Sequence, residues 1–326
     1  MRNENAEMRN GKSKKSLRYI LLAVPAFILS LPWRLYVGVV WFIGYTVPGL
    51  QLMLRRPRTP AGPKLDLSKF EPTWSDEFDG GRLDRSKWLN MANDGLDSAA
   101  EGAHKRHGGW SCLDMAQVKD GALHISSVNS ARGMAGGPPG SYAAAITTRH
   151  SFRQRYGYFE ARCKCPKGQG LWSAFWLHNE KVLTQVDGTG RPGTEIDVME
   201  SPFCRSRNPR RKNSIPSSLH YGSYGLFHRM KNVGRYCVAD IYDSFHTYGV
   251  EWNENGYIFY IDGVESGRTR AGGVSRNEQY LILSVEHHRG GFKGLFWAGD
   301  VRKNKPEDMT DFEVDYVRAY QYKELC

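Results

Sequence analysis

The chain has 326 residues and a formal net charge of +11, and 12% of its residues are aromatic. The charge is uneven, because residues 1–60 hold ten Lys/Arg and two Asp/Glu, a net of +8, which leaves +3 for the remainder. Nucleic-acid binding is not indicated, since no recognition-helix, zinc-finger or RNA-binding aromatic motif accompanies the basic tail.

The first 54 residues have the pattern of a membrane anchor. A polar, basic tail over residues 1–18 precedes two apolar stretches, 19–32 and 35–54, and the second is long enough to cross a bilayer as a helix. No small-residue cleavage site follows the first stretch, so we expect residues 19–54 to be retained as one or two transmembrane helices. One crossing would place the following domain outside the cytoplasm, and a hairpin of two helices would leave it inside.

Residues 55–69 are rich in proline, which excludes a continuous helix and predicts an extended spacer between membrane and domain. From residue 70 onward, short runs rich in aromatic and β-branched residues alternate with Gly and Asn/Asp, and no long helical period appears. We therefore predict one all-β domain over residues 70–326, a size at which sandwiches fold as single units.

Six cysteines allow up to fifteen complete pairings, and the sequence does not choose among them. Their spacing matches neither a CxxC redox motif nor a zinc knuckle, so structural or free thiols are expected. The six are Cys112, Cys163, Cys165, Cys204, Cys237 and Cys326.

The run EIDVME at residues 195–200 carries the strongest chemical signal. In a regular strand Glu195 and Asp197 share one face, and Glu200 points to the other. A β-bulge at Val198-Met199 would bring Glu200 back to the face of its partners, and bulges are frequent beside active sites. Three carboxylates would then lie together, with Ile196 on the buried side.

With that bulge, the Cα atoms of Glu195 and Glu200 lie roughly 13 Å apart, and side chains leaning inward leave a carboxyl gap of about 5 Å. A retaining glycosidase needs ~5–5.5 Å, whereas an inverting one needs ~6.5–9.5 Å. The spacing favours retention, with Glu195 as nucleophile, Glu200 as acid/base and Asp197 holding Glu195. A metal site made of the same carboxylates is the alternative.

These residues resemble the ExDxxE signature of glycoside hydrolase family 16, and segments from Trp74 to Gln321 resemble that family in order. They are YGYFEAR (156–162), GLWSAFWL (170–177), FHTYGVEW (245–252), IFYIDG (258–263) and FEVDYVRAYQ (312–321). The resemblance implies a β-jelly-roll of two curved antiparallel sheets with an open cleft for a polysaccharide. It also implies the same roles for Glu195, Asp197 and Glu200.

The resemblance extends to further candidate residues. Trp172 and Trp176 are four residues apart, so both lie on one strand face and could present flat apolar surfaces to sugar rings. His220 resembles a histidine that approaches the cleft in this family. No cofactor is required, but many relatives hold a structural calcium, and the matching positions are Glu77, Gly121 and Asp315.

The substrate is less well defined than the chemistry. β-1,3-glucan or β-1,3-1,4-glucan is the leading expectation, but the segment 90–110 departs from laminarinases, and five basic residues at 205–212 keep a sulfated or uronate-bearing glycan open. A transglycosylase would share every catalytic residue, and a carbohydrate-binding module would have lost them. We expect a monomer anchored to the membrane, with its domain outside the cytoplasm, where polysaccharide is met.

Overall fold

The computed structural model describes residues 54–92, 97–98, 102–185, 187–203, 212–225, 227–290, 298–306 and 308–325, with six single positions between 35 and 51. Most of the predicted anchor, the basic run at 205–211, Cys204 and Cys326 lie outside the described residues. Among the helices that are described, none has the length and hydropathy needed to span a bilayer. Membrane anchoring therefore stays a prediction.

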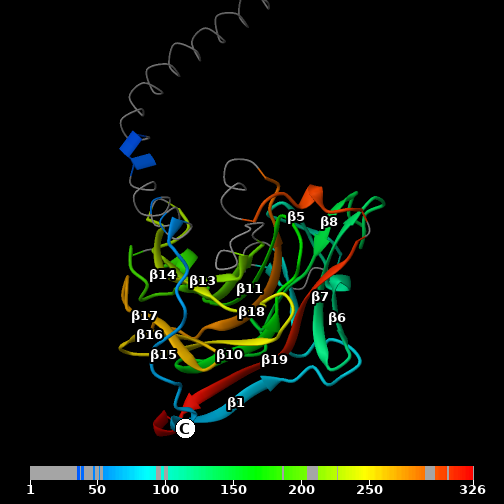
Figure 1. Cartoon of the computed structure of the whole chain (residues 1–326). Coiled ribbons are helices and arrows are strands. Elements are labelled where there is room, and N and C mark those ends of the chain that lie inside the picture. The colour runs from blue at the N-terminus through cyan, green and yellow to red at the C-terminus, as the bar shows by residue number, and fades with distance from the viewer. Residues whose placement is uncertain are drawn as a thin grey trace, which may run out of the picture.

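Two β-sheets make up the described domain, which confirms the all-β class (Figure 1). The larger sheet has eleven strands, in the order β17-β16-β15-β10-β19-β7-β8-β5-β4, with β1 beside β19 and β6 beside β7. The second sheet has eight strands, in the order β14-β13-β12-β11-β18-β9-β2-β3. Strand β1 pairs with β19 through Phe70 and Tyr322, so the chain end lies beside the start of the domain (Figure 1).

The strands of the larger sheet are β1 (Phe70–Asp76), β4 (His104–Arg106), β5 (Gly109–Ser111), β6 (Ala116–Lys119), β7 (Ala122–Ser130), β8 (Gly140–Ala143), β10 (Gly157–Lys164), β15 (His246–Asn253), β16 (Gly256–Ile261), β17 (Val264–Thr269) and β19 (Thr310–Tyr322). Those of the second sheet are β2 (Leu89–Ala92), β3 (Asp97–Ser98), β9 (Ala145–Thr147), β11 (Leu171–His178), β12 (Glu195–Pro202), β13 (Ser214–Tyr221), β14 (Arg229–Cys237) and β18 (Tyr280–His287). The described helical pieces are short: α3 (Lys181–Thr184) and the 3-10 turns η2 (Leu67–Lys69), η4 (Leu113–Met115), η5 (Val301–Lys303) and η6 (Lys323–Leu325).

Alternation along β11 divides its side chains between two environments. Leu171, Phe175 and Leu177 are fully buried in the large core shared by both sheets. Trp172, Ala174 and Trp176 belong to a separate, smaller cluster on the opposite face. Since successive residues of a strand point to opposite faces, the second sheet has an inner face on the core and an outer face available for a site.

Truncating Phe175 to alanine is expected to lower the free energy of unfolding by about 3–5 kcal/mol, because this ring is fully buried and leaves a cavity in the core. Urea denaturation of the two proteins measures the difference. The matched control is Phe227→Ala, since Phe227 is 50% exposed, and its effect is expected to stay within about 0.5 kcal/mol. Equal losses for the two variants would contradict the assignment of Phe175 to the core.

The proline-rich segment before the domain is bound to the edges of both sheets. Arg58 exchanges backbone hydrogen bonds with β14, donating to Arg235 at 2.9 Å and accepting from Cys237 at 2.8 Å. The backbone N–H of Gly62 donates to Glu265 of β17 at 3.0 Å, and that of Leu65 donates to Gly263, in the turn before β17, at 2.8 Å. The extended backbone that proline imposes suits such edge pairing, so the predicted spacer is in part an added strand that covers two edges.

The four described cysteines, Cys112, Cys163, Cys165 and Cys237, are free thiols. Cys163 and Cys165 are buried, and burial raises the pKa of the Cys165 thiol to about 11. A thiol that stays protonated is a poor nucleophile and a poor metal ligand. For these four residues, the expectation of structural or free thiols is confirmed.

Candidate active site

The bulge predicted in the EIDVME strand is present. Strand β12 pairs with β11 through Phe175 and Met199, and next through Trp176 and Asp197, so Val198 is an extra residue without a partner on β11. Glu200 is opposite Ala174. Because Ala174 and Trp176 lie on the outer face of β11, their partners Glu200 and Asp197 share that face.

The same bulge turns the apolar residues of β12 inward. Ile196, Val198 and Met199 are 0%, 3% and 0% exposed and belong to the large core. In a regular strand Val198 and Met199 would point to opposite faces, so they could not both pack into the same core. The one-residue insertion thus satisfies the core and places the carboxylates on the outer face.

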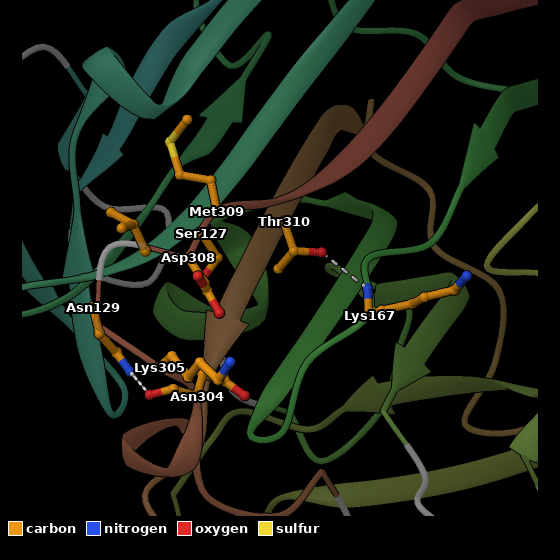
Figure 2. A pocket seen from close by; sticks show the side chains of 9 residues that line it. Ser127, Asn129, Lys167, Asn304, Lys305, Asp308, Met309 and Thr310 are labelled. Atoms are coloured by element: carbon orange, nitrogen blue, oxygen red, sulfur yellow. Dashed lines mark hydrogen bonds between the residues drawn. The ribbon is translucent and has the colours of Figure 1, made fainter.

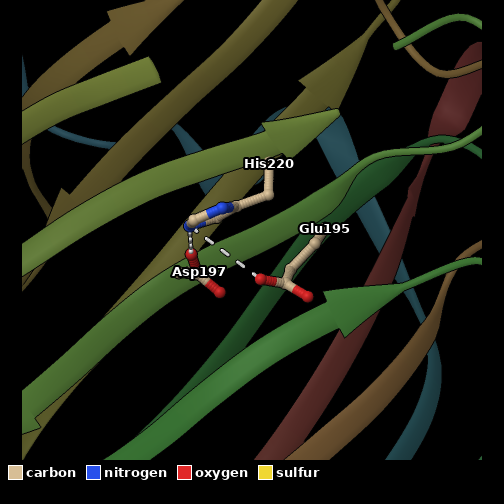
Figure 3. A group of neighbouring side chains, drawn as sticks. All are labelled: Glu195, Asp197 and His220. Carbon is tan, nitrogen blue, oxygen red and sulfur yellow. Dashed lines mark ion pairs between the residues drawn. The ribbon is translucent and has the colours of Figure 1, made fainter. Parts of the chain in front are cut away.

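Glu195, Asp197 and His220 form a compact polar cluster (Figure 3). His220 Nε2 lies 3.3 Å from Asp197 Oδ2 and 3.9 Å from a Glu195 oxygen. Ser218 Oγ donates a hydrogen bond of 2.5 Å to Asp197 Oδ2. Strand pairing brings these groups together, since Glu195 is opposite His220 and Asp197 is opposite Ser218 on β13.

The carboxyl groups of Glu195 and Glu200 both have raised pKa values. Burial is the main cause in each case, and the negative charge of Asp197 adds to it, while His220 opposes the shift. Because both pKa values are raised by burial and by neighbouring negative charge, ionising both groups at once is costly, which favours one carboxylate and one carboxylic acid. This is the division of protonation that a general acid and a nucleophile need.

His220 carries the compensating positive charge. Burial alone would lower its pKa, but the hydrogen bond to Asp197 and the charges of Glu195 and Asp197 raise the pKa of His220 to about 9. Its Nδ1 lies 2.9 Å from Nε2 of His228. Burial, with the nearby His220, lowers the pKa of His228 to about 3, so the neutral His228 accepts this hydrogen bond.

The three ligand atoms of Glu195, Asp197 and His220 lie within 4.8 Å of one another, so the group could also surround a cation, as the alternative interpretation expected. A cation there would have to displace the proton of His220, which already balances the carboxylates. A proton on His220 and a cation would therefore compete for the same group of carboxylates.

Trp172 and Trp176 share one strand face, as their spacing predicted, and the structure shows that it is the outer face. Trp176 is 8% exposed and its Nε1 donates to Ser284 Oγ at 3.3 Å, whereas Trp172 is less buried. The Trp172 ring lies 5.2 Å from the ring of His107. Of the two tryptophans, Trp172 is better exposed to stack on a sugar, and sugar binding by either stays a prediction.

Sequence reasoning missed a buried ion pair beside Trp172. Arg106 Nε and Nη2 lie 2.8 and 2.7 Å from Oε1 of Glu286, and both side chains are buried. Glu286 is opposite Trp172 on β18, so the pair lies on the same face as the carboxylates. Two charged residues separated by 180 positions leave no local sequence pattern that could have predicted this pair.

Two of the three expected calcium positions have arginine partners in the structure, and calcium binding stays a prediction. Both Glu77 oxygens are bound by Arg318, at 3.0 and 2.7 Å, and Asp315 is bound by Arg162 at 2.5 Å. Gly121 lies in the turn between β6 and β7. Guanidinium groups on both carboxylates supply the positive charge that a calcium ion would otherwise bring.

A hollow in the described surface has a lining that includes none of these carboxylates (Figure 2). Its lining comes from β7, from the start of β19 and from nearby loops, and includes Asn129, Lys167 and Thr310. Asp308 is its sole acidic residue. Glycosidases use a pair of carboxyl groups. The face that carries Glu195 and Glu200 is therefore the candidate active site.

Known proteins place the domain in a family. The family profile of the GH16 domain of β-porphyranases A–D matches residues 69–322. The chain therefore belongs to glycoside hydrolase family 16.

Curated relatives include glucan endo-1,3-beta-glucosidase A1 of Niallia circulans, 26% identical over 86% of this chain and 43% of that protein. Endo-1,3-1,4-beta-glycanase ExsH of Rhizobium meliloti is 31% identical over 54% of this chain and 32% of that protein. Beta-porphyranase B of Phocaeicola plebeius is 27% identical over 81% and 87%. This chain thus spans less than half the length of the first two relatives.

A solved structure shares the fold. SCLam, a non-specific endo-beta-1,3(4)-glucanase from family GH16, superposes with a TM-score of 0.63 and 23% identity, over 83% of this chain and 99% of that one. The likeness agrees with the expected jelly-roll of two sheets.

Proposed function

We propose that this protein is a retaining, endo-acting hydrolase of β-1,3-glucan or β-1,3-1,4-glucan, with Glu195 as nucleophile, Asp197 as its assistant and Glu200 as acid/base. The observation that carries the proposal is the bulge at Val198, which puts Glu200 on the face of Asp197. Relatives named as endo-1,3-β-glucosidase and endo-1,3-1,4-β-glycanase support the substrate.

The reaction proceeds in two displacements. A Glu195 oxygen bonds to the anomeric carbon while the glycosidic C–O bond breaks and Glu200 gives its proton to the leaving oxygen. A water molecule then attacks the same carbon, Glu200 takes the water proton, and the bond to Glu195 breaks. Asp197, held by Ser218 and His220, fixes the orientation of Glu195 between the steps.

The rate of hydrolysis is expected to fall on the acid side at a pH above the ordinary carboxyl range of ~4–5, because Glu195 must be ionised and burial raises its pKa. On the alkaline side it falls when Glu200, whose pKa burial raises well above its ordinary value, loses its proton. A pH profile of kcat/KM on laminarin checks both limbs. An acid limb at or below pH 4 would contradict the assignment.

A sulfated galactan is the second candidate substrate, because the matching family profile is that of β-porphyranases. A panel of laminarin, lichenan, agarose, carrageenan, porphyran and an acidic exopolysaccharide separates the two, with Glu195→Gln as the blank. New reducing ends from laminarin or lichenan support the proposal, and ends from porphyran alone would overturn the glucan assignment. Longer products would indicate a transglycosylase, and binding without any product a carbohydrate-binding protein.

We also propose that residues 19–54 anchor the enzyme in a membrane with the catalytic domain on the outside. The length of the apolar stretch at 35–54 and the basic tail before it support this orientation. Protease added to intact cells would digest the domain in this arrangement and would spare it in the hairpin alternative.

A further inference from the structure

A line of hydrogen bonds joins Glu195 on β12 to Tyr280 on β18, across the intervening strand β11. The Tyr224 hydroxyl, from the loop after β13, donates to Glu195 Oε2. His178 Nε2, at the end of β11, lies 3.0 Å from the Tyr224 hydroxyl, and His178 Nδ1 lies 2.7 Å from the Tyr280 hydroxyl on β18. Four separate elements thus meet in one chain of contacts that ends on the nucleophile.

The direction of every bond in this line follows from the first. A phenol has one proton, and Tyr224 gives its proton to Glu195, so its oxygen accepts from His178 Nε2–H. Burial lowers the pKa of His178 to about 3, so the ring is neutral and its Nδ1 accepts from the Tyr280 hydroxyl. Tyr280, His178 and Tyr224 therefore each donate toward Glu195.

The packing of these rings restrains Tyr224. The rings of His178 and Tyr224 are nearly parallel, with an interplanar angle of 7° and centroids 6.2 Å apart. His178 and Tyr280 are 1% and 0% exposed. An apolar side chain would fill this buried position without needing hydrogen-bond partners. A neutral imidazole needs a partner for each ring nitrogen, and the two phenols supply them.

Several charged groups, together with the Tyr224 hydroxyl, set the balance between the charged and neutral forms of Glu195. Asp197 and Glu200 on β12 disfavour the charged form of Glu195, and His220 on β13 and Arg106 on β4 favour it. The hydroxyl of Tyr224 is a donor in direct hydrogen-bond contact with the carboxylate. A hydrogen bond to a charged group is stronger than one to a neutral group, so this contact strengthens whenever negative charge returns to Glu195.

We propose that Tyr224 is a further catalytic residue, which stabilises Glu195 as the leaving group when the glycosyl–enzyme is hydrolysed, and that His178 and Tyr280 position it. This inference rests on the proposed retaining mechanism. In that second step the electron pair of the breaking C–O bond passes to the Glu195 carboxylate, and the water proton passes to Glu200. Tyr224 donates its hydrogen bond to the charge that forms and keeps its own proton.

The test uses Tyr224→Phe on 2,4-dinitrophenyl β-laminaribioside, whose leaving group makes hydrolysis of the glycosyl–enzyme the slow step. We expect kcat to fall about tenfold to a hundredfold, the range set by one hydrogen bond to a charged group. KM should fall in parallel, and a burst of dinitrophenol equal to the enzyme concentration should precede the steady state. The acid limb of kcat/KM should move to higher pH, because the lost bond favoured ionised Glu195.

Matched variants separate catalysis from folding. Tyr221→Phe removes a hydroxyl from a neighbouring tyrosine on the face of β13 opposite His220, and it should leave all these values unchanged. His178→Gln keeps an N–H donor near Tyr224 and should retain most of the activity, whereas His178→Phe should show the burst and the shifted limb even if Tyr224→Phe does not fold.

Three outcomes would overturn the inference. One is a Tyr224→Phe enzyme with wild-type kinetics. Another is a loss of kcat with KM, the acid limb and the burst all unchanged, which would indicate a structural role. A wild-type enzyme that releases no dinitrophenol and cleaves no member of the polysaccharide panel would overturn the hydrolase proposal itself, and this inference with it.

Discussion

Replacing Glu195 by glutamine is expected to reduce the hydrolysis of laminarin by at least ~10³-fold, because covalent catalysis without its nucleophile retains only binding and acid assistance. The amide has nearly the same size and can still accept the hydrogen bond from Tyr224, so the fold should be unaffected. The release of reducing ends at equal enzyme concentration measures the loss.

The matched control is Glu254→Gln, the same chemical change on an exposed residue in the turn between β15 and β16. This control should hydrolyse laminarin at the wild-type rate. Residual wild-type activity in the Glu195 variant would remove Glu195 from its role.

Replacing Glu200 by alanine is expected to slow hydrolysis of the polysaccharide by about 10²–10⁴-fold, the usual contribution of a general acid or base. Azide should restore turnover of dinitrophenyl β-laminaribioside, since the small side chain leaves room for an anion that needs no general base. The product should be a β-glycosyl azide, because azide attacks the α-linked glycosyl–enzyme from the opposite face.

The configuration of that product, read by NMR, tests retention directly. An α-glycosyl azide from the Glu200 variant would mean that Glu200, and not Glu195, is the nucleophile. A variant that azide does not accelerate, while retaining its fold, would remove Glu200 from the acid/base role.

The raised pKa values of the two glutamates follow from the same arrangement. Burial on the outer face of β12, with Asp197 between them, makes it costly to ionise both Glu195 and Glu200. The pKa of His220 is raised to about 9, and its positive charge makes the net charge of the group less negative. The arrangement therefore favours a site with one carboxylate and one carboxylic acid.

Some residues have contacts that the sequence did not predict. Glu77 and Asp315, which were matched to calcium ligands by resemblance, form ion pairs with Arg318 and Arg162. The segment at residues 55–69 was expected to be an extended spacer, and its backbone also bonds to β14 and β17. Each difference arises from a contact between residues far apart in the chain, which no local pattern records.

What the sequence alone determined is the all-β class, the shared strand face of Trp172 and Trp176, and the bulge at Val198-Met199. The class follows from strand-like runs that recur along the domain, and the other two follow from strand periodicity within one short segment each. The tertiary structure alone decided which groups surround Glu195: His228 behind His220, the ion pair of Arg106 with Glu286, and the line through Tyr224, His178 and Tyr280. These groups converge because strands distant in the chain become neighbours in a sheet, and that adjacency is a product of folding rather than of spacing.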